Sequence, residues 1–202
     1  AARWVDRPAD LAGAGDVDLV VELIGGTGEP ASALIDAALV AGKSVVTANK
    51  ALLAERAMQL AVVSEATGAS LAYEAAVAGG IPIIKTLREA LAGNKISRVS
   101  GILNGTCNFI LSQMESKGVT FEAALKDAQQ RGFAEAEPDL DISGMDAAQK
   151  LALLAGLAFG VQPDVSQISV TGIDAITEQD ISFADEFNSV IRLIAIASES
   201  PD

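Results

Sequence analysis

Asp146 and Lys150 are the residues whose types and spacing most directly suggest chemistry. They are four positions apart at the start of a strongly apolar segment that is typical of a buried helix. On a helix, this spacing places both side chains on one face, with their Cβ atoms about 5–6 Å apart. A half-buried lysine beside a carboxylate can pass a proton to an oxygen that becomes negative during a reaction. The alternative is a solvent-exposed ion pair, in which Asp146 completes a capping box with Ser143.

Several carboxylates precede this pair in a stretch without helical or strand periodicity. They are Glu135, Glu137, Asp139 and Asp141. Such a cluster could bind a metal ion or the ammonium group of a substrate. A solvated acidic loop is the simpler interpretation, and the residues alone leave both open.

A second lysine, Lys50, follows a short apolar run at residues 44–47. Parallel α/β sheets bind ligands at the carboxyl ends of their strands, so Lys50 could meet a cofactor phosphate, a carboxylate or a reacting carbonyl. A surface lysine near a helix start fits equally well. Gly25 and Gly26 end another apolar run, and their small size would let a flat ring approach the backbone.

The single cysteine, Cys107, lies in the polar turn LNGTCNF at residues 103–109, where a helix is predicted to begin. Backbone N–H groups there could hold an anion, and a thiol at a helix N-terminus can be an activated nucleophile. The chain contains no histidine that could deprotonate it. A small, packed cysteine is the simpler interpretation.

The acidic composition argues against several classes of function. With 27 acidic and 14 basic residues, the chain carries a formal charge of -13, which repels nucleic acids and anionic membrane surfaces. Its most apolar stretch, residues 151–161, is shorter than the roughly 20 residues that span a membrane. Without histidine, the usual zinc shell and histidine acid–base catalysis are excluded. One cysteine and no apolar leader favour a cytoplasmic protein.

The elements that must position these residues change character along the chain. Strands are predicted at residues 18–24, 44–47 and 70–73, and helices at residues 31–41 and 52–66. This alternation is typical of an α/β fold with a parallel sheet, and the first strand is apolar enough to be covered on both faces. We therefore predict a partial Rossmann-like domain at residues 1–80.

The second part of the chain, residues 81–202, lacks this alternation and is predicted to form an α+β domain. Helices are predicted at residues 82–92, 107–116, 120–130, 146–159 and from 178 to the end, with strands at residues 96–103 and 167–171. Thr120 is the predicted N-cap of its helix.

Five segments together resemble the homoserine dehydrogenase family. They are ELIGG at residues 22–26, TANK at 47–50, YEAAVAGGIPII at 73–84, GILNGTCNFIL at 101–111 and GFAEAEPDLDISGMDAAQK at 132–150. The resemblance implies reversible reduction of L-aspartate 4-semialdehyde to L-homoserine with NADH or NADPH, on the route to threonine and methionine. Family members are usually homodimers. The resemblance also implies that residues 81–202 bind the substrate, carry out catalysis and form the dimer.

The resemblance also implies roles for individual residues. Lys150 matches the proton donor, and Lys50 matches a second active-site lysine beside the cofactor. Glu135 and Asp146 match residues that bind the amino-acid substrate, with Asp146 also part of the catalytic pair. Asp141 matches a further active-site carboxylate.

Cofactor and ion contacts are implied in the same way. NAD or NADP contacts correspond to Ile24, Gly25, Gly26, Thr47, Ala48, Asn49, Lys50 and Gly132. The sodium site of the family, in which mostly main-chain oxygens hold the ion, corresponds to Glu74, Val77, Gly79 and Ile81.

Nothing before Asp18 matches the glycine-rich first turn of a nucleotide-binding domain. We therefore expect that turn, and the end of the catalytic domain, to lie outside this sequence.

Two alternatives remain at this point. One is a semialdehyde or acyl dehydrogenase that forms a thioester on Cys107. The other is a non-catalytic, ligand-binding or dimer-forming module, which fits a chain without its nucleotide turn.

Overall fold

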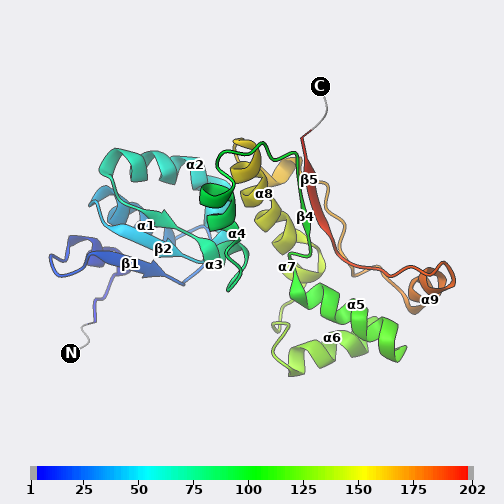
Figure 1. Cartoon of the computed structure of the whole chain (residues 1–202). Helices are drawn as coiled ribbons and strands as arrows, with labels where there is room; N and C mark the ends of the chain where they lie inside the picture. The colour runs from blue at the N-terminus through cyan, green and yellow to red at the C-terminus, as the bar shows by residue number, and fades with distance from the viewer. Residues whose placement is uncertain (1–3, 200–202) are drawn as a thin grey trace. The chain divides into compact units, whose positions relative to one another are not determined.

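The computed structural model describes residues 4–199, which form two compact units (Figure 1). The first contains the residues up to Ser97 together with Ala152–Val165. The second contains Arg98–Leu151 together with the residues from Ser166 onward. Each unit has its own sheet, and each is described below by itself.

The first unit is built on a parallel three-stranded sheet with the order β1-β2-β3. Its strands are β1 (Leu19–Glu22), β2 (Ser44–Thr47) and β3 (Leu71–Ala72). Glu22 and Thr47 are register partners, so the carboxyl ends of β1 and β2 lie side by side. The predicted α/β fold with a parallel sheet is therefore confirmed.

Two helices connect these strands, α1 (Ala31–Val40) and α2 (Lys50–Thr67). Asn49 is the N-cap of α2, and its side chain accepts a hydrogen bond from the Leu52 N–H. Gly68 in the left-handed conformation is the C-cap. Ile35 of α1 and Val45 of β2 are fully buried, which places the core between helix and sheet.

The expectation that β1 is covered on both faces is wrong for the described part of the chain. Val20 and Glu22 are buried, whereas Leu19 and Val21 are 50% and 56% exposed. α1 contacts β1, while the side chains of Leu19 and Val21 remain half exposed. The apolar run thus alternates in burial like a strand with one covered face.

Short elements complete the first unit. They are the 3-10 helix η1 (Pro8–Gly13), α3 (Glu74–Val77), α4 (Ile83–Lys85) and the π-helical turn η2 (Thr86–Ala90). The predicted helix at residues 82–92 is therefore divided between α4 and η2. The carboxylate of Glu74 accepts the Ile84 and Lys85 N–H groups and so caps the first of these turns.

In the second unit, helices pack around α5 (Gly105–Lys117), whose buried side chains belong to the core. The other elements are α6 (Phe121–Gln130), α7 (Asp139–Ile142), the first half of α8 (Met145–Phe159), α9 (Glu178–Glu186), and the antiparallel strands β4 (Arg98–Gly101) and β5 (Ala195–Ser198). Ile110 and Leu111 of α5 are fully buried against Ala128 of α6. Thr120 caps α6 as predicted.

Two predictions for this unit are wrong. Residues 167–171 form no strand, and the preceding η3 (Val165–Gln167) is a 3-10 turn. Beyond it, the Ile173 N–H bonds to the Ile142 carbonyl, and a Cβ built at Gly172 would lie 2.4 Å from that same oxygen. The helix from residue 178 does not continue to the end of the chain: it ends at Glu186, and residues 195–198 form a strand that pairs with β4.

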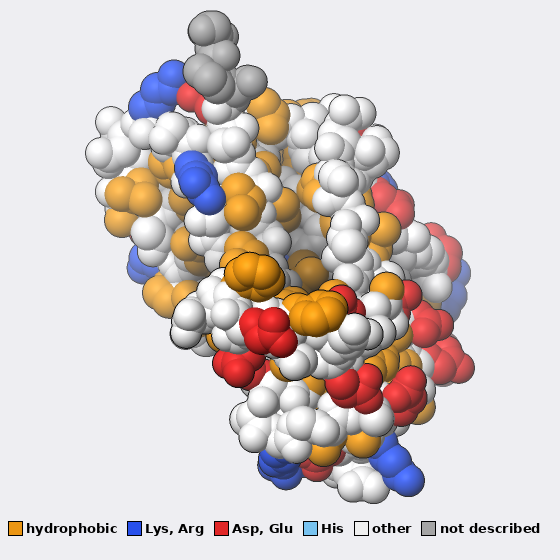
Figure 2. All heavy atoms as spheres, turned by 90° about the vertical axis from the view of Figure 1, so that its right-hand side faces the viewer, with side chains coloured by type: hydrophobic (Ala, Val, Ile, Leu, Met, Phe, Trp, Pro, Cys, Tyr) orange, Lys and Arg blue, Asp and Glu red, His pale blue; other side chains and the backbone are white. Residues whose placement is uncertain are grey.

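The surface and the helices agree with the composition. On the face shown in Figure 2, acidic side chains gather along one side and outnumber the basic ones, as the formal charge of -13 suggests. Within residues 4–199, no helix is both long and apolar enough to cross a membrane.

Candidate active site

Asp146 and Lys150 form a sheltered ion pair on α8. The Lys150 Nζ lies 2.7 Å from Asp146 Oδ2, and the two side chains are only 20% and 6% exposed. Lys150 Nζ also donates to the Leu103 carbonyl oxygen at 3.0 Å. The alternative of a solvent-exposed pair is therefore wrong. Two of the three ammonium N–H groups are used in these contacts, which leaves a donor for an incoming oxygen.

Asn104 joins this pair to a second carboxylate. Its side-chain Nδ2 donates to Asp141 Oδ1 at 2.8 Å and to Asp146 Oδ2 at 2.9 Å. Sequence reasoning treated Asn104 only as part of a polar turn. No local signal could have shown its role, because its partners are 37 and 42 residues further along the chain.

The carboxylates of the predicted acidic loop have different surroundings in the structure. Asp141 reaches the Asn104 amide, whereas the Glu135 side chain is exposed. The Glu135 main-chain oxygen accepts a hydrogen bond from Gln129 Nε2 of α6 at 3.1 Å, which fixes the loop backbone. Asp139 instead begins α7. Among the described residues, no group of three His, Cys, Asp or Glu side chains is placed to hold a metal ion.

Cys107 is a poor nucleophile in this setting. It is fully buried, and its Sγ donates to the Asp141 carbonyl oxygen at 3.1 Å. Burial, followed by the nearby carboxylates of Asp141 and Asp146, raises the pKa of the thiol to about 12. Its backbone N–H is already bonded to Asn104 Oδ1 at 2.8 Å, so the turn does not offer that group to an anion. The thioester alternative finds no support here.

The carboxyl edge of the sheet in the first unit is organised by Glu22, which sequence reasoning did not single out. This side chain is fully buried. Its Oε1 accepts the Ile24 and Gly25 N–H groups at 2.7 and 2.9 Å, and its Oε2 accepts the Thr47 hydroxyl at 2.5 Å. A carboxylate within an apolar strand is itself a usable signal, because buried charge requires partners.

Asn49 ties the same two strand ends together. Its Nδ2 donates to the Gly26 carbonyl oxygen at 2.7 Å, and its N–H donates to Thr47 Oγ1 at 2.9 Å. Gly25 and Gly26 have φ angles of 83° and 80°, which only glycine adopts readily. A Cβ at either position would meet nothing within 4 Å, so the backbone is open to a ligand.

The predicted cofactor contacts fall into both units. Ile24 to Gly26 and Thr47 to Lys50 meet at this edge, with Lys50 as the first residue of α2. Gly132 belongs to the second unit and follows the end of α6 with a φ of 75°.

Two family models match consecutive parts of the chain. The model described as homoserine dehydrogenase matches residues 82–200. The model of the homoserine dehydrogenase NAD-binding domain matches residues 2–74. The chain belongs to the homoserine dehydrogenase family.

Individual homoserine dehydrogenases agree with this assignment. The protein of Neisseria gonorrhoeae is 45% identical over 98% of this chain and 46% of its own length. That of Bacillus subtilis is 46% identical over 90% of this chain and 42% of its own. The chain thus spans about half the length of the curated relatives it matches.

Solved structures of the family share the fold. A homoserine dehydrogenase from Thiobacillus denitrificans has a TM-score of 0.92 and 46% identity, covering 97% of this chain and 45% of its own. A hyperthermophilic archaeal homoserine dehydrogenase in complex with NADPH has a TM-score of 0.81 and 28% identity, covering 97% and 57%. The resemblance stated from the sequence motifs is confirmed.

The turn that resembles the sodium site of the homoserine dehydrogenase family follows β3. The Glu74 carboxylate is engaged with the N–H groups of α4, so it caps a helix here. The main-chain oxygens of Glu74 and Ile81 each accept one backbone hydrogen bond, from Ala78 and Ile83. Each carbonyl has a second lone pair, so main-chain ligation is compatible with this backbone.

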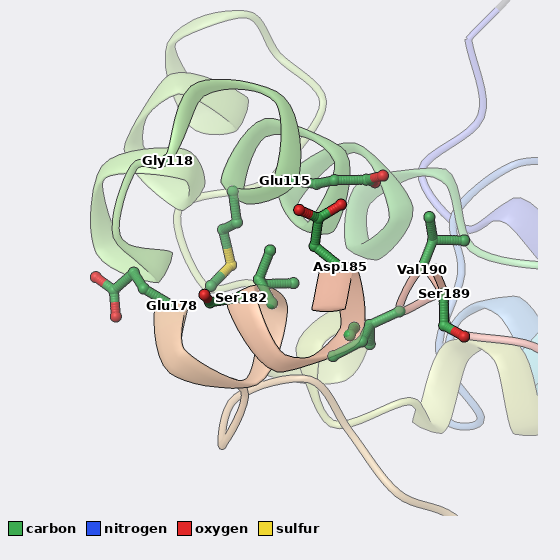
Figure 3. A pocket seen from close by; sticks show the side chains of 11 residues that line it. Glu115, Gly118, Glu178, Ser182, Asp185, Ser189 and Val190 are labelled. Atoms are coloured by element: carbon green, nitrogen blue, oxygen red, sulfur yellow. The ribbon is translucent and has the colours of Figure 1, made fainter. Parts of the chain in front are cut away.

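A cavity of about 260 Å³ in the second unit lies apart from all the residues predicted to act in homoserine dehydrogenase chemistry. Figure 3 shows Glu115 and Gly118 near the end of α5, opposite Glu178, Ser182 and Asp185 of α9. Glu115 is already paired with Arg192 at 2.5 Å. The cavity contains none of the residues of the Asp146–Lys150 cluster.

Proposed function

We propose that the protein containing this chain catalyses the reversible reduction of L-aspartate 4-semialdehyde to L-homoserine with NADH or NADPH. The observation that carries this proposal is the sheltered contact of 2.7 Å between Lys150 and Asp146 in a homoserine dehydrogenase chain. A lysine placed in this way can supply the proton that aldehyde reduction requires.

Lys150 is the proposed proton donor. Reduction turns the aldehyde oxygen into an alkoxide, and the remaining N–H of the ammonium can donate to it. Asp146 holds the ammonium in place from one side, and the Leu103 carbonyl holds it from another. A donor fixed before the reaction stabilises the developing charge without reorganisation.

The carboxylates near Lys150 are the proposed site for the substrate ammonium group. Asp146 and Asp141 are adjacent through Asn104, and the exposed Glu135 is accessible to a ligand from solvent. Lys50 is the proposed second active-site lysine, whose positive charge favours the transition state.

We assign cofactor binding to the contacts that the family resemblance implies, in residues 1–80 and at Gly132. Support comes from the match to an NAD-binding domain and from the open backbone at Gly25 and Gly26. A bound reduced nicotinamide supplies the hydride. NAD and NADP both remain candidates. Residues 81–202 carry substrate binding, catalysis and dimerisation in this proposal.

A sodium ion on the turn of Glu74, Val77, Gly79 and Ile81, and a homodimer, complete the proposal. Both rest on the resemblance to the family. Free lone pairs on the main-chain oxygens of the turn support the ion site.

Replacement of Lys150 by alanine in the full-length protein tests the proposed reaction. We expect kcat/KM for homoserine oxidation to fall about 10²- to 10⁴-fold, as for the loss of a general acid–base group. Steady-state kinetics measure the effect, with Lys117→Ala as a control because Lys117 is a half-exposed lysine at the end of α5. A Lys150→Ala enzyme with wild-type kcat would refute the assignment.

A further inference from the structure

The amide of Asn104 lies between the two carboxylates nearest to Lys150. It donates to Asp141 Oδ1 at 2.8 Å and to Asp146 Oδ2 at 2.9 Å, and its side chain is almost completely buried. We propose that Asn104 is a positioning residue, which holds the two carboxylates side by side and thereby keeps Lys150 in place as the proton donor. This inference rests on the proposed function.

The orientation of the Asn104 amide is determined by its neighbours. Its Oδ1 accepts the backbone N–H of Cys107 at 2.8 Å, and a backbone N–H can only donate. The NH₂ group must therefore be the end that faces the carboxylates, since these only accept when ionised. All three hydrogen bonds of the side chain are mutually consistent, and reversing the amide would break each of them.

Two adjacent carboxylates repel each other, and a site of this kind ordinarily binds a proton more readily. The Asn104 amide opposes this effect, because hydrogen bonds to an ionised acceptor stabilise its charged form. An uncharged amide also adds no positive charge at Asp146 Oδ2, where a cation in place of Asn104 would compete with Lys150 for the same oxygen.

The charged side chains next to Asn104 come from two helices. Asp141 belongs to α7, and Asp146 and Lys150 belong to α8, while the Cys107 thiol of α5 lies beside them. Lys150 contacts Asp146, and the Asn104 amide connects Asp146 to Asp141. Loss of the amide donors removes this connection, which weakens the hold on Lys150 and loosens the two carboxylates that are proposed to bind a substrate ammonium.

The backbone at Asn104 is fixed independently of its amide. Its carbonyl oxygen accepts a hydrogen bond from Asn108 Nδ2 at 3.0 Å, and the same nitrogen donates to the Leu193 oxygen at 3.1 Å. The side chain of residue 104 can therefore be changed while this anchor remains. Aspartate and serine are also good N-cap residues, so both can keep the cap of α5.

Asn104→Asp in the full-length enzyme is the decisive variant. It keeps the shape and the cap but replaces the two donors by a third carboxylate. We expect the acidic limb of the kcat/KM profile to move up by about one pH unit or more, with a smaller shift for Asn104→Ser. Asn188→Asp is the matched control, because it makes the same replacement at an exposed asparagine that follows α9. It should leave the limb in place.

An acidic limb that stays at its wild-type pH in folded Asn104→Asp would overturn the positioning role. If Asn104→Asp does not fold, the same result for Asn104→Ser would overturn it. A Lys150→Ala enzyme that remains active would refute the proposed proton donor instead, so the two failures are distinguishable.

Discussion

Cys107 lies in the first turn of α5, a position where the partial positive charge of a helix N-terminus ordinarily favours a thiolate. Here burial and the carboxylates of Asp141 and Asp146 act in the opposite direction and prevail. The single cysteine of the chain is therefore a packing residue beside the cluster of Asp141, Asp146 and Lys150. Its conformation is fixed by its hydrogen bond to the Asp141 carbonyl oxygen.

Cys107→Ser separates this interpretation from a thioester mechanism. Serine can keep the hydrogen bond to the Asp141 oxygen, so we expect the full-length protein to keep most of the proposed dehydrogenase activity in steady-state assays. An enzyme that uses Cys107 as a nucleophile would lose essentially all of its activity, because the hydroxyl is a far weaker nucleophile without a general base.

The same thiol contributes to the pH dependence of stability. Its pKa rises from 9.0 to about 12 in the folded chain. Between these values the unfolded thiol ionises first, so the unfolded state binds fewer protons and the free energy of unfolding falls as the pH rises. Below that window the thiol is protonated in both states and has no effect. Denaturant titrations at pH 9 and pH 11 measure this effect. The free energy of unfolding should fall more between these two pH values for the wild type than for Cys107→Ser.

At the level of elements, the ends of β1 and β2 depend on one buried carboxylate. Glu22→Gln keeps one acceptor oxygen and replaces the other by an NH₂ group, so the side chain can no longer accept hydrogen bonds both from the Ile24 and Gly25 N–H groups and from the Thr47 hydroxyl. We expect a loss of about 1–3 kcal/mol in the free energy of unfolding, with weaker NADPH binding by the full-length protein. Denaturant unfolding and fluorescence titration measure the two effects.

Glu55→Gln is the matched control for this prediction, because Glu55 is an exposed carboxylate on α2. Its stability and NADPH affinity should equal those of the wild type. Equal values for Glu22→Gln would show that the buried carboxylate does not organise the strand ends.

Elements with strong local signals could be predicted from the sequence. β2 occupies its predicted residues, and α6 begins after the predicted cap Thr120. The failures have a physical cause, since β5 forms only because residues 195–198 meet β4, almost a hundred positions away in the chain. A local pattern does not contain that partner. Residues 167–171 were apolar enough for a strand, but no strand pairs with them.

In the candidate site, too, contacts within one element could be predicted from the sequence, whereas contacts between elements could not. The contact between Asp146 and Lys150 follows from helical periodicity, because both residues lie on α8. The roles of Asn104 and Glu22 depend on partners from other elements, which no spacing rule reveals. Motifs shared with the family identified Asp141 but not the amide that holds it.

At the scale of the whole molecule, the chain spans about half the length of the curated relatives it matches. A glycine-rich turn after a strand holds the pyrophosphate in doubly wound folds, and residues 1–17 show no such turn. We expect this chain alone to bind NADH and NADPH at least about tenfold more weakly than the full-length protein, because the chain itself offers no turn of this kind to the phosphates. Fluorescence titration measures both affinities, and equal values would contradict the expectation.

Gly172 has an effect beyond its own segment. A Cβ there would lie 2.4 Å from the Ile142 oxygen and 2.8 Å from the Ser143 Cα, and these two residues belong to the segment that connects Asp141 to Asp146. Any larger residue must push this stretch of backbone aside and so alter the spacing of Asp141 and Asp146. In a screen for inactive variants, residue 172 would be classed with the active site, although glycine has no side chain that could take part in a reaction.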